Sequence, residues 1–155
     1  MARSRPGALR ADRSPDPGPR TRETPQPVRI HGLSAHTSRA IHRVEHESGT
    51  HFLSPGAAAS ALRRYRKFVT TPGRGILYPR ASACPACPGC GLDDVRHARD
   101  ILAETLRLLP PRARAELGRA VAELDRRYLR RTLPAPRSRP GPWWHRRLAE
   151  GAEGW

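Results

Sequence analysis

Seventeen prolines in 155 residues limit where this chain can form regular structure. Six of them fall before residue 28, where they prevent a continuous helix. Later prolines, at positions 55, 72, 110, 111 and 134, stand where apolar helical patterns begin or end. Only 37% of the residues are hydrophobic and 5% are aromatic, so the composition excludes a large single core.

The same pattern divides the chain into four regions. Residues 1–28 are predicted to be a disordered, basic, proline-rich tail, since Leu9 and Val28 are the only larger apolar residues among them that could enter a core. Residues 29–80 are expected to be basic and weakly helical. Residues 81–133 combine a cysteine knuckle with a helical hairpin, and residues 134–155 are expected to form a flexible tail with tryptophan and arginine.

Helical periodicity is strongest after the cysteines. Apolar side chains recur every three or four positions from Val95 to Leu109 and again from Ala113 to Tyr128. Pro110 stops the first helix and Pro111 can open the second. So short a connection predicts an antiparallel helical hairpin over about residues 92–133. Ion pairs at helical spacing are expected on its exposed faces, namely Arg96 with Asp100, Glu104 with Arg107, and Glu123 with Arg127.

Two shorter helices are predicted before the cysteines. Ser34 is expected to cap a helix that runs to about Glu47. The next helix is expected to have Ser54 as its N-cap, with Pro55 as the first helical residue. Its predicted buried stripe comprises Ala58, Ala61, Leu62, Tyr65, Phe68 and Val69. The predicted fold class is therefore mainly α, a small hairpin preceded by a cysteine knuckle and one or two short helices, with disordered N- and C-terminal tails.

The net charge of +15 points to a polyanionic partner. Arginine supplies 28 of the 29 basic residues, and residues 31–80 carry eight basic groups against two acidic ones. We expect phosphate contacts, without sequence reading, from four basic residues of the second helix, Arg63, Arg64, Arg66 and Lys67. Two alternatives stay open: the charge serves only solubility, or it binds an acidic membrane surface.

The cysteines predict a structural zinc ion. In Cys84-Pro85-Ala86-Cys87-Pro88-Gly89-Cys90-Gly91, two Cys-Pro-x-Cys units share Cys87, and this spacing lets thiolates reach one ion. The portion from Cys87 to Gly91 resembles the knuckle of zinc ribbons and rubredoxins, which implies zinc ligation by Cys87 and Cys90. His97 is the favoured fourth ligand, ahead of His51. Unliganded thiols, redox or disulfide use, an iron–sulfur cluster, and an ion shared by two chains remain alternatives.

Two further resemblances concern catalysis and DNA reading. His42-Arg43-Val44-Glu45-His46 is similar to the His-x-x-Glu-His motif of inverzincin metallopeptidases. The resemblance implies zinc binding by His42 and His46, water activation by Glu45, and Glu123 as a third ligand. Residues Leu108 to Arg114 resemble the opening of the promoter-binding helix-turn-helix of bacterial sigma factors. A hairpin turn explains that segment equally well, because the apolar pattern continues through one helix without a glycine turn.

The C-terminal Trp143-Trp144 pair lies beside Arg146 and Arg147. This mixture suits stacking on bases, docking of a protein partner, or capping of the helical core. The sequence has no apolar run long enough for a membrane span, and the closely spaced cysteines favour a reducing, cytoplasmic location. We therefore expect a small non-enzymatic, zinc-stabilised module that associates with nucleic acid. The alternative is a protein-interaction adaptor that uses the hairpin and the Trp pair, and a metallopeptidase-like site is a remote third.

Overall fold

The computed structural model describes residues 28–82, 91, 93–136 and 140–150. Within them are four α-helices, α1 (Ala35–Glu47), α2 (Ala57–Val69), α4 (Val95–Leu108) and α5 (Pro111–Arg131). Two short 3-10 helices, η2 (His51–Leu53) and η3 (Trp143–His145), precede α2 and follow α5. The described residues contain no β-strand. The predicted mainly α class is confirmed, whereas the predicted cysteine knuckle and N-terminal tail lie outside these residues.

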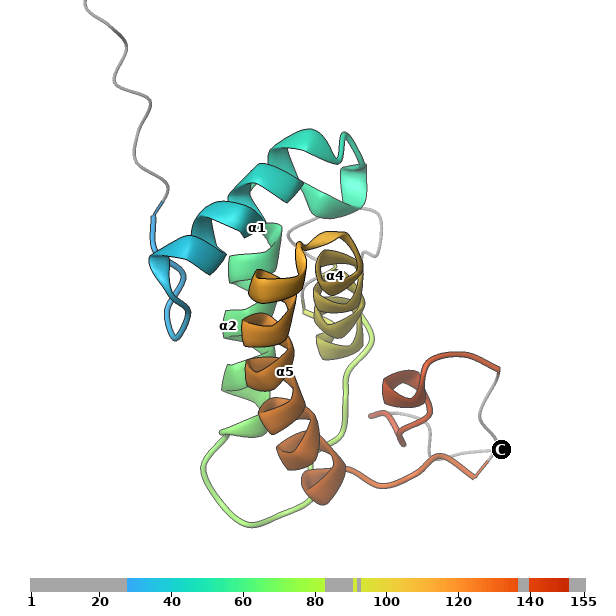
Figure 1. Cartoon of the computed structure of the whole chain (residues 1–155). Coiled ribbons are helices and arrows are strands. Elements are labelled where there is room, and N and C mark those ends of the chain that lie inside the picture. The colour runs from blue at the N-terminus through green and yellow to red at the C-terminus, as the bar shows by residue number, and fades with distance from the viewer. Residues whose placement is uncertain (1–27, 83–90, 92, 137–139, 151–155) are drawn as a thin grey trace, which may run out of the picture.

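The helices form a small bundle with one crossing helix. Figure 1 shows α2, α4 and α5 side by side, with α1 lying across the end at which α2 and α5 begin. The most extensive helix contact is between α2 and α4, and α1 touches all three other helices. The main partner of α4 is therefore a helix from before the cysteines.

The hairpin of α4 and α5 is built as its sequence predicts. Leu109 and Pro110 alone separate the helices, and Pro111 occupies the first turn of α5. Leu106 lies opposite Gly118 and Arg99 binds Asp125, so residues earlier in α4 meet residues later in α5. That order defines an antiparallel pair, and α5 continues without a break to Arg131.

The buried apolar side chains form one cluster. It takes residues from all four helices and from both sides of residue 80, and its largest members include Tyr65, Tyr128 and Leu102. The apolar stripes predicted for α2, α4 and α5 all face it. The buried members from those three helices are Ala57, Ala58, Ala61, Leu62, Tyr65, Val69, Val95, Ala98, Ile101, Leu102, Ala113, Leu117, Val121, Leu124 and Tyr128.

The start of α2 differs from the sequence prediction. Ser34 does cap α1, accepting a hydrogen bond from the Thr37 N–H, but Ser54 and Pro55 lie outside α2. The helix begins at Ala57 after Gly56, whose φ of +84° is a left-handed conformation suited to glycine. The cap comes from another helix, because the Glu45 carboxylate accepts from the Gly56 and Ala58 amides at 2.9 and 2.8 Å. A side chain eleven residues upstream cannot be recognised from local spacing.

Within the region predicted to be a flexible C-terminal tail, residues 140–150 make backbone hydrogen bonds to other parts of the protein. The Ala135 and Leu148 amides donate to the carbonyls of Arg146 and Leu133, at 3.0 and 2.8 Å. Farther on, the Glu150 amide donates to the Pro79 carbonyl at 2.8 Å. These bonds hold the segment beside the end of α5. In addition, the two tryptophans bury part of their rings on the core. This packing agrees with the core-capping interpretation of the Trp pair.

Two of the three predicted ion pairs are confirmed. Glu104 binds Arg107 and Glu123 binds Arg127, both at 2.6 Å. The third prediction is wrong because Arg96 pairs at 2.8 Å with Asp94, the residue whose side chain caps α4. Asp100 instead binds residues of the C-terminal segment.

Candidate nucleic-acid interface

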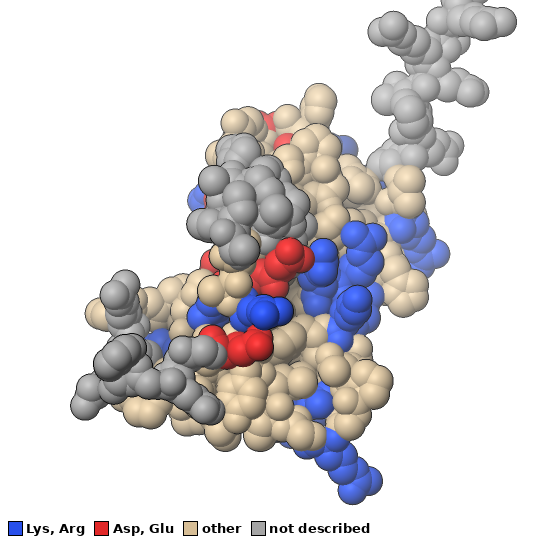
Figure 2. All heavy atoms as spheres, turned by 180° about the vertical axis from the view of Figure 1, so that it is seen from behind, with Lys and Arg blue, Asp and Glu red and all other residues tan. Residues whose placement is uncertain are grey.

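The predicted phosphate-binding residues lie on the outer face of α2. Tyr65 is fully buried between them, and the helical repeat therefore turns Arg63, Arg64 and Lys67 outward. Arg66 is partly buried beside the segment that precedes α1. In the view of Figure 2, from behind, Lys and Arg side chains gather over α2. Thus all four predicted residues share one side of the bundle.

These four side chains differ in their partners. Arg64 forms an ion pair with Asp93 at 3.1 Å, which offsets its charge. Arg66 donates to His31 Nδ1 at 3.1 Å, and that contact holds its guanidinium over the bundle without neutralising it. Arg63 and Lys67 are exposed and make no ion pair within the described residues. Three of the four charges thus stay available to an anionic ligand.

A pocket of about 630 Å³ opens beside these residues. Arg63 and Arg66 of α2 line it together with Arg29 and His31 of the segment before α1. Its remaining walls include apolar side chains, among them Ile30 and Leu62. None of the lining residues is an aspartate or glutamate. The combination of cationic edge and apolar wall is suited to an anion that carries a hydrophobic part.

Arg29 is a basic residue of this site that sequence reasoning missed. Its Nε donates to the Leu33 carbonyl at 2.8 Å, while the Ile30 amide donates to Ser38 Oγ at 3.0 Å. These bonds tie the segment before α1 to the start of α1, and Arg29 lines the pocket together with residues of α2. The sequence placed residue 29 at the edge of a tail, and no local pattern indicates that position.

A second row of arginines, on α5, was also missed. Positions separated by seven residues lie nearly above one another on a helix, and this spacing relates Arg112, Arg119 and Arg126. Arg130 follows one turn later, and all four are exposed. The regular spacing was visible in the sequence. These residues provide a charge-matched comparison for α2.

Glu45 and His42 of the metallopeptidase-like motif make contacts that stabilise the fold. Glu45 is only 3% exposed and its two oxygens cap α2, while His42 contacts Glu45 at 3.3 Å and the Val28 carbonyl at 2.9 Å. His46 is exposed on α1, and Glu123 pairs with Arg127 on α5. No group of three or more metal-ligating side chains forms within the described part of the chain. The motif residues are therefore not assembled as a ligand set there.

The predicted zinc site can be followed only at His97. Cys84, Cys87 and Cys90 lie outside the described residues, as does the side chain of His51. His97 occupies the first turn of α4, and its ring meets the ring of Phe52 edge-on with centroids 5.1 Å apart. This position directly follows the cysteine segment in the chain.

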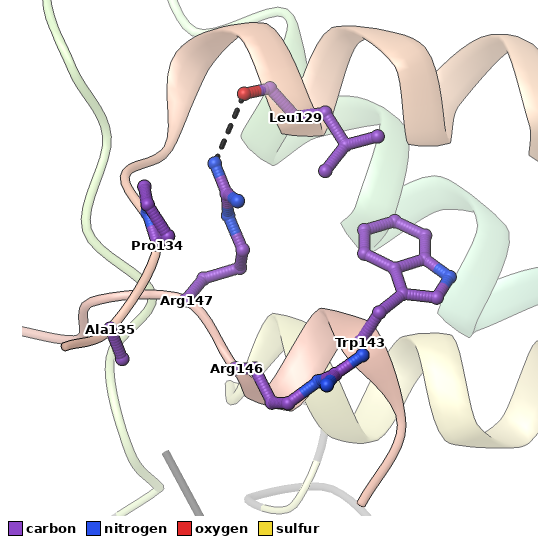
Figure 3. A pocket seen from close by; sticks show the side chains of 6 residues that line it. All are labelled: Leu129, Pro134, Ala135, Trp143, Arg146 and Arg147. Atoms are coloured by element: carbon purple, nitrogen blue, oxygen red, sulfur yellow. Dashed lines mark hydrogen bonds between the residues drawn. The ribbon is translucent and has the colours of Figure 1, made fainter. Parts of the chain in front are cut away.

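The Trp pair lies where the C-terminal segment meets α4 and α5. Trp144 Nε1 donates to Asp100 at 2.7 Å, and the Arg99 guanidinium lies 4.2 Å from the centre of the Trp144 ring. Trp143 lines a separate pocket of about 440 Å³ together with Leu129, Pro134, Ala135, Arg146 and Arg147. Figure 3 shows the Trp143 ring turned toward Leu129 across this pocket, with Arg147 bound to the Leu129 carbonyl. Trp144 is thus committed to internal contacts, whereas Trp143 presents part of its ring to the pocket.

Comparison with known proteins leaves the function to be argued from these sites. A scan against protein-family models, a search of curated proteins and a search of solved structures each found no match to the chain. Within the described ranges, no helix combines the length and apolarity that crossing a membrane requires.

Proposed function

We propose that this protein is a small non-enzymatic module that associates with nucleic acid through the outer face of α2. The observation that carries the proposal is that Arg29, Arg63 and Arg66 line a pocket without a lining carboxylate, while Lys67 is exposed on the same helix as Arg63 and Arg66. Phosphodiesters carry one negative charge each, and Lys and Arg release condensed counterions when they bind them. Such contacts act on the backbone and do not read base sequence.

The salt dependence of binding tests this proposal. We expect a fluorescently labelled single-stranded oligonucleotide of about 20 nucleotides to bind more weakly as salt rises from about 50 to 200 mM. The double variant Arg63→Gln/Lys67→Gln should weaken binding about tenfold and lower the slope of log K against log salt by about 2.

The arginine row of α5 supplies the control for this experiment. Arg119→Gln/Arg126→Gln removes the same charge from another helix and should lower the affinity by less than about twofold. Equal losses in the two double variants would contradict the assignment to α2. Salt-independent or undetectable binding by the unaltered protein would overturn nucleic-acid association itself.

A structural zinc ion is part of the proposal. Cys84, Cys87, Cys90 and His97 are its proposed ligands, supported by the Cys-Pro-x-Cys spacing and by the position of His97 at the start of α4. The ion would join the cysteine segment to the helix that packs most extensively on α2. Its role is to stabilise the fold, with no catalytic step assigned to it.

A protein-interaction adaptor is the second candidate, and the Trp143 pocket is the observation that favours it. Leu129, Pro134 and Trp143 give this pocket apolar walls, and exposed aromatic side chains often anchor protein partners. A pull-down that survives nuclease treatment and is lost in Trp143→Ala would support this function. Capture that nuclease abolishes would support the nucleic-acid proposal instead.

A further inference from the structure

The pocket beside α2 has a chemistry more specific than a basic surface. It joins the segment before α1, His42 of α1 and the part of α2 up to Arg66. Arg29, Arg63 and Arg66 surround it, and planar guanidinium groups can bind two phosphate oxygens at once. At about 630 Å³, the pocket has the size usual for sites that enclose small ligands.

Hydrogen bonds prepare the cationic side of the pocket for an anion. Arg66 donates to His31 Nδ1 at 3.1 Å, and this bond holds the guanidinium beside the pocket. His42 binds the Val28 carbonyl at 2.9 Å and thereby ties the preceding segment to α1. Glu45 contacts His42 and the α2 amides, but it is buried and turned inward. Glu45 itself does not line the pocket.

Part of the pocket's lining is apolar. Ile30, Pro55, Ala59 and Leu62 contribute to it, and such a wall gives a bare inorganic anion no favourable contact. A nucleoside has a hydrophobic base face that can cover these side chains. The pocket thus favours a phosphate joined to a nucleoside over phosphate alone.

We propose that this pocket binds a phosphate monoester carried by a nucleoside. A monoester bears about −1.5 to −2 charges at neutral pH, whereas an internal phosphodiester bears one, so three arginines favour the monoester. Two sources share this chemistry, a free nucleotide and the phosphorylated end of a strand. The strand-end source rests on the proposed function, while binding of a free nucleotide does not.

A steric variant separates this inference from general nucleic-acid binding. Ser60 lines the pocket and is partly buried on α2. Ser60→Leu fills part of the space and leaves every charge in place, and Ser60→Ala is the matched control. Circular dichroism spectra of both variants should equal that of the unaltered protein, since leucine and alanine are both strong helix formers.

The first measurement uses adenosine 5′-monophosphate and inorganic phosphate as probes in calorimetric titrations. The nucleotide should bind at least about tenfold more tightly than phosphate, and Ser60→Leu should lower its affinity at least about tenfold, while Ser60→Ala retains it. Equal binding of the two probes, or nucleotide binding that survives Ser60→Leu, would overturn the inference.

The second measurement assigns the source of the ligand. One oligonucleotide is compared with a 5′-phosphate and with a 5′-hydroxyl end. If the oligonucleotide with the 5′-phosphate binds about fivefold more tightly, and Ser60→Leu abolishes this preference, the pocket is assigned to strand ends. If the two oligonucleotides bind equally and the nucleotide still binds, the pocket is assigned to free nucleotides. Absence of both effects overturns the pocket, while unchanged salt dependence in Ser60→Leu leaves the proposed function standing.

Discussion

At the residue scale, two buried or partly buried carboxylates organise helix starts in other elements. Glu45 of α1 caps α2 through the Gly56 and Ala58 amides. Glu116 of α5 accepts from the Ser34 amide at 2.6 Å and from the Ser34 and Thr37 hydroxyls at 2.7 and 2.5 Å at the start of α1. A helix start leaves amide donors without helical partners, and an anion placed there is favoured by the helix dipole. These two glutamates therefore join α1 to α2 and to α5.

Loss of the Glu45 carboxylate should destabilise the fold. Glu45→Ala leaves the Gly56 and Ala58 amides without their acceptor, and we expect the free energy of unfolding to fall by about 1–3 kcal/mol. Urea denaturation measures the change. Glu47→Ala, an exposed position on the same helix, should change it by less than about 0.5 kcal/mol. Equal effects of the two substitutions would contradict the capping role.

The zinc proposal is tested at the same scale. Purified protein should contain about one zinc per chain by elemental analysis, or half that if two chains share an ion. Cys87→Ser should abolish retention, and His97→Ala should weaken it more than His51→Ala does. Phe52→Ala removes the ring contact to His97 and should leave the metal content unchanged. If protein purified without chelators contains no metal and is fully helical, the zinc proposal is wrong.

At the scale of elements, the contact between α1 and α5 should depend on acidity. The hydrogen bonds from Thr37 and Ser34 lower the pKa of Glu116 from its ordinary 4.5 to about 2. A carboxyl with a lowered pKa in the folded state stabilises that state above its unfolded pKa and loses this contribution as it becomes protonated. The stabilisation from Glu116 is thus fully present above about pH 5 and disappears as the pH falls from about 4.5 toward 2.

Glu116→Gln isolates this contribution. The variant should be less stable than the unaltered protein by about 1–2 kcal/mol at pH 7, and the difference should shrink toward pH 2. Denaturation at several pH values measures it. Glu123→Gln removes an exposed ion pair from the same helix and should show a smaller difference, of about 0.5 kcal/mol or less. A difference for Glu116→Gln that does not vary with pH would contradict the assignment.

The C-terminal segment is an element whose attachment rests on Trp144. Its ring lies over Arg99, whose Nη1 is buried without a hydrogen-bond partner in the described structure, and its N–H binds Asp100. Arg99 itself binds Asp125 through two hydrogen bonds of 2.9 and 3.0 Å. The tryptophan thus covers a buried ion pair that joins α4 to α5.

Removal of the Trp144 ring should release this segment. We expect Trp144→Ala to lower the free energy of unfolding by about 2 kcal/mol through lost burial and lost cation–π attraction. Trypsin should then cleave after Arg146 or Arg147 at least about fivefold faster. Leu133→Ala, at an exposed apolar position, provides the control. Unchanged cleavage in Trp144→Ala would show that backbone hydrogen bonds suffice to hold the segment.

At the scale of the whole molecule, the described helices depend on one another for burial. Tyr65 of α2 donates to Asp125 of α5 at 2.7 Å, and this carboxylate also binds Arg99 of α4. Burial, together with the hydrogen bond to Asp125, raises the pKa of Tyr65 well above its usual value, so its hydroxyl remains a donor. Three helices thus meet in one polar network within the apolar core.

The hairpin should therefore fold poorly without α2. A peptide of residues 92–133 exposes Ala98 and Leu102, which are fully buried in the complete chain, and helices of this length are marginally stable in water without packing. Circular dichroism at 25 °C should show less than about half of the helicity expected for α4 and α5, with a non-cooperative thermal transition. A cooperative transition with full helicity would show that the hairpin has an adequate core of its own.

The sequence alone determined the positions of the four helices to within a few residues. Apolar repeats and prolines act within one helix, so the stripes from Ala58 to Val69, from Val95 to Leu109 and from Ala113 to Tyr128 could be recognised locally. The same local reasoning predicted four basic residues around the apolar stripe of α2. It also predicted a zinc site from the cysteine spacing, and that site stays a prediction.

Only the tertiary structure decided which elements meet. Periodicity shows that a face is apolar, but it does not specify whether α5 or α2 covers α4, because many pairings bury similar area. The cap of Glu45 on α2, the docking of Trp144 on Arg99 and the pocket that Arg29 lines with α2 all bring together residues of different elements. They exist because the packed helices bring complementary groups together, and the pocket beside α2 results from that packing.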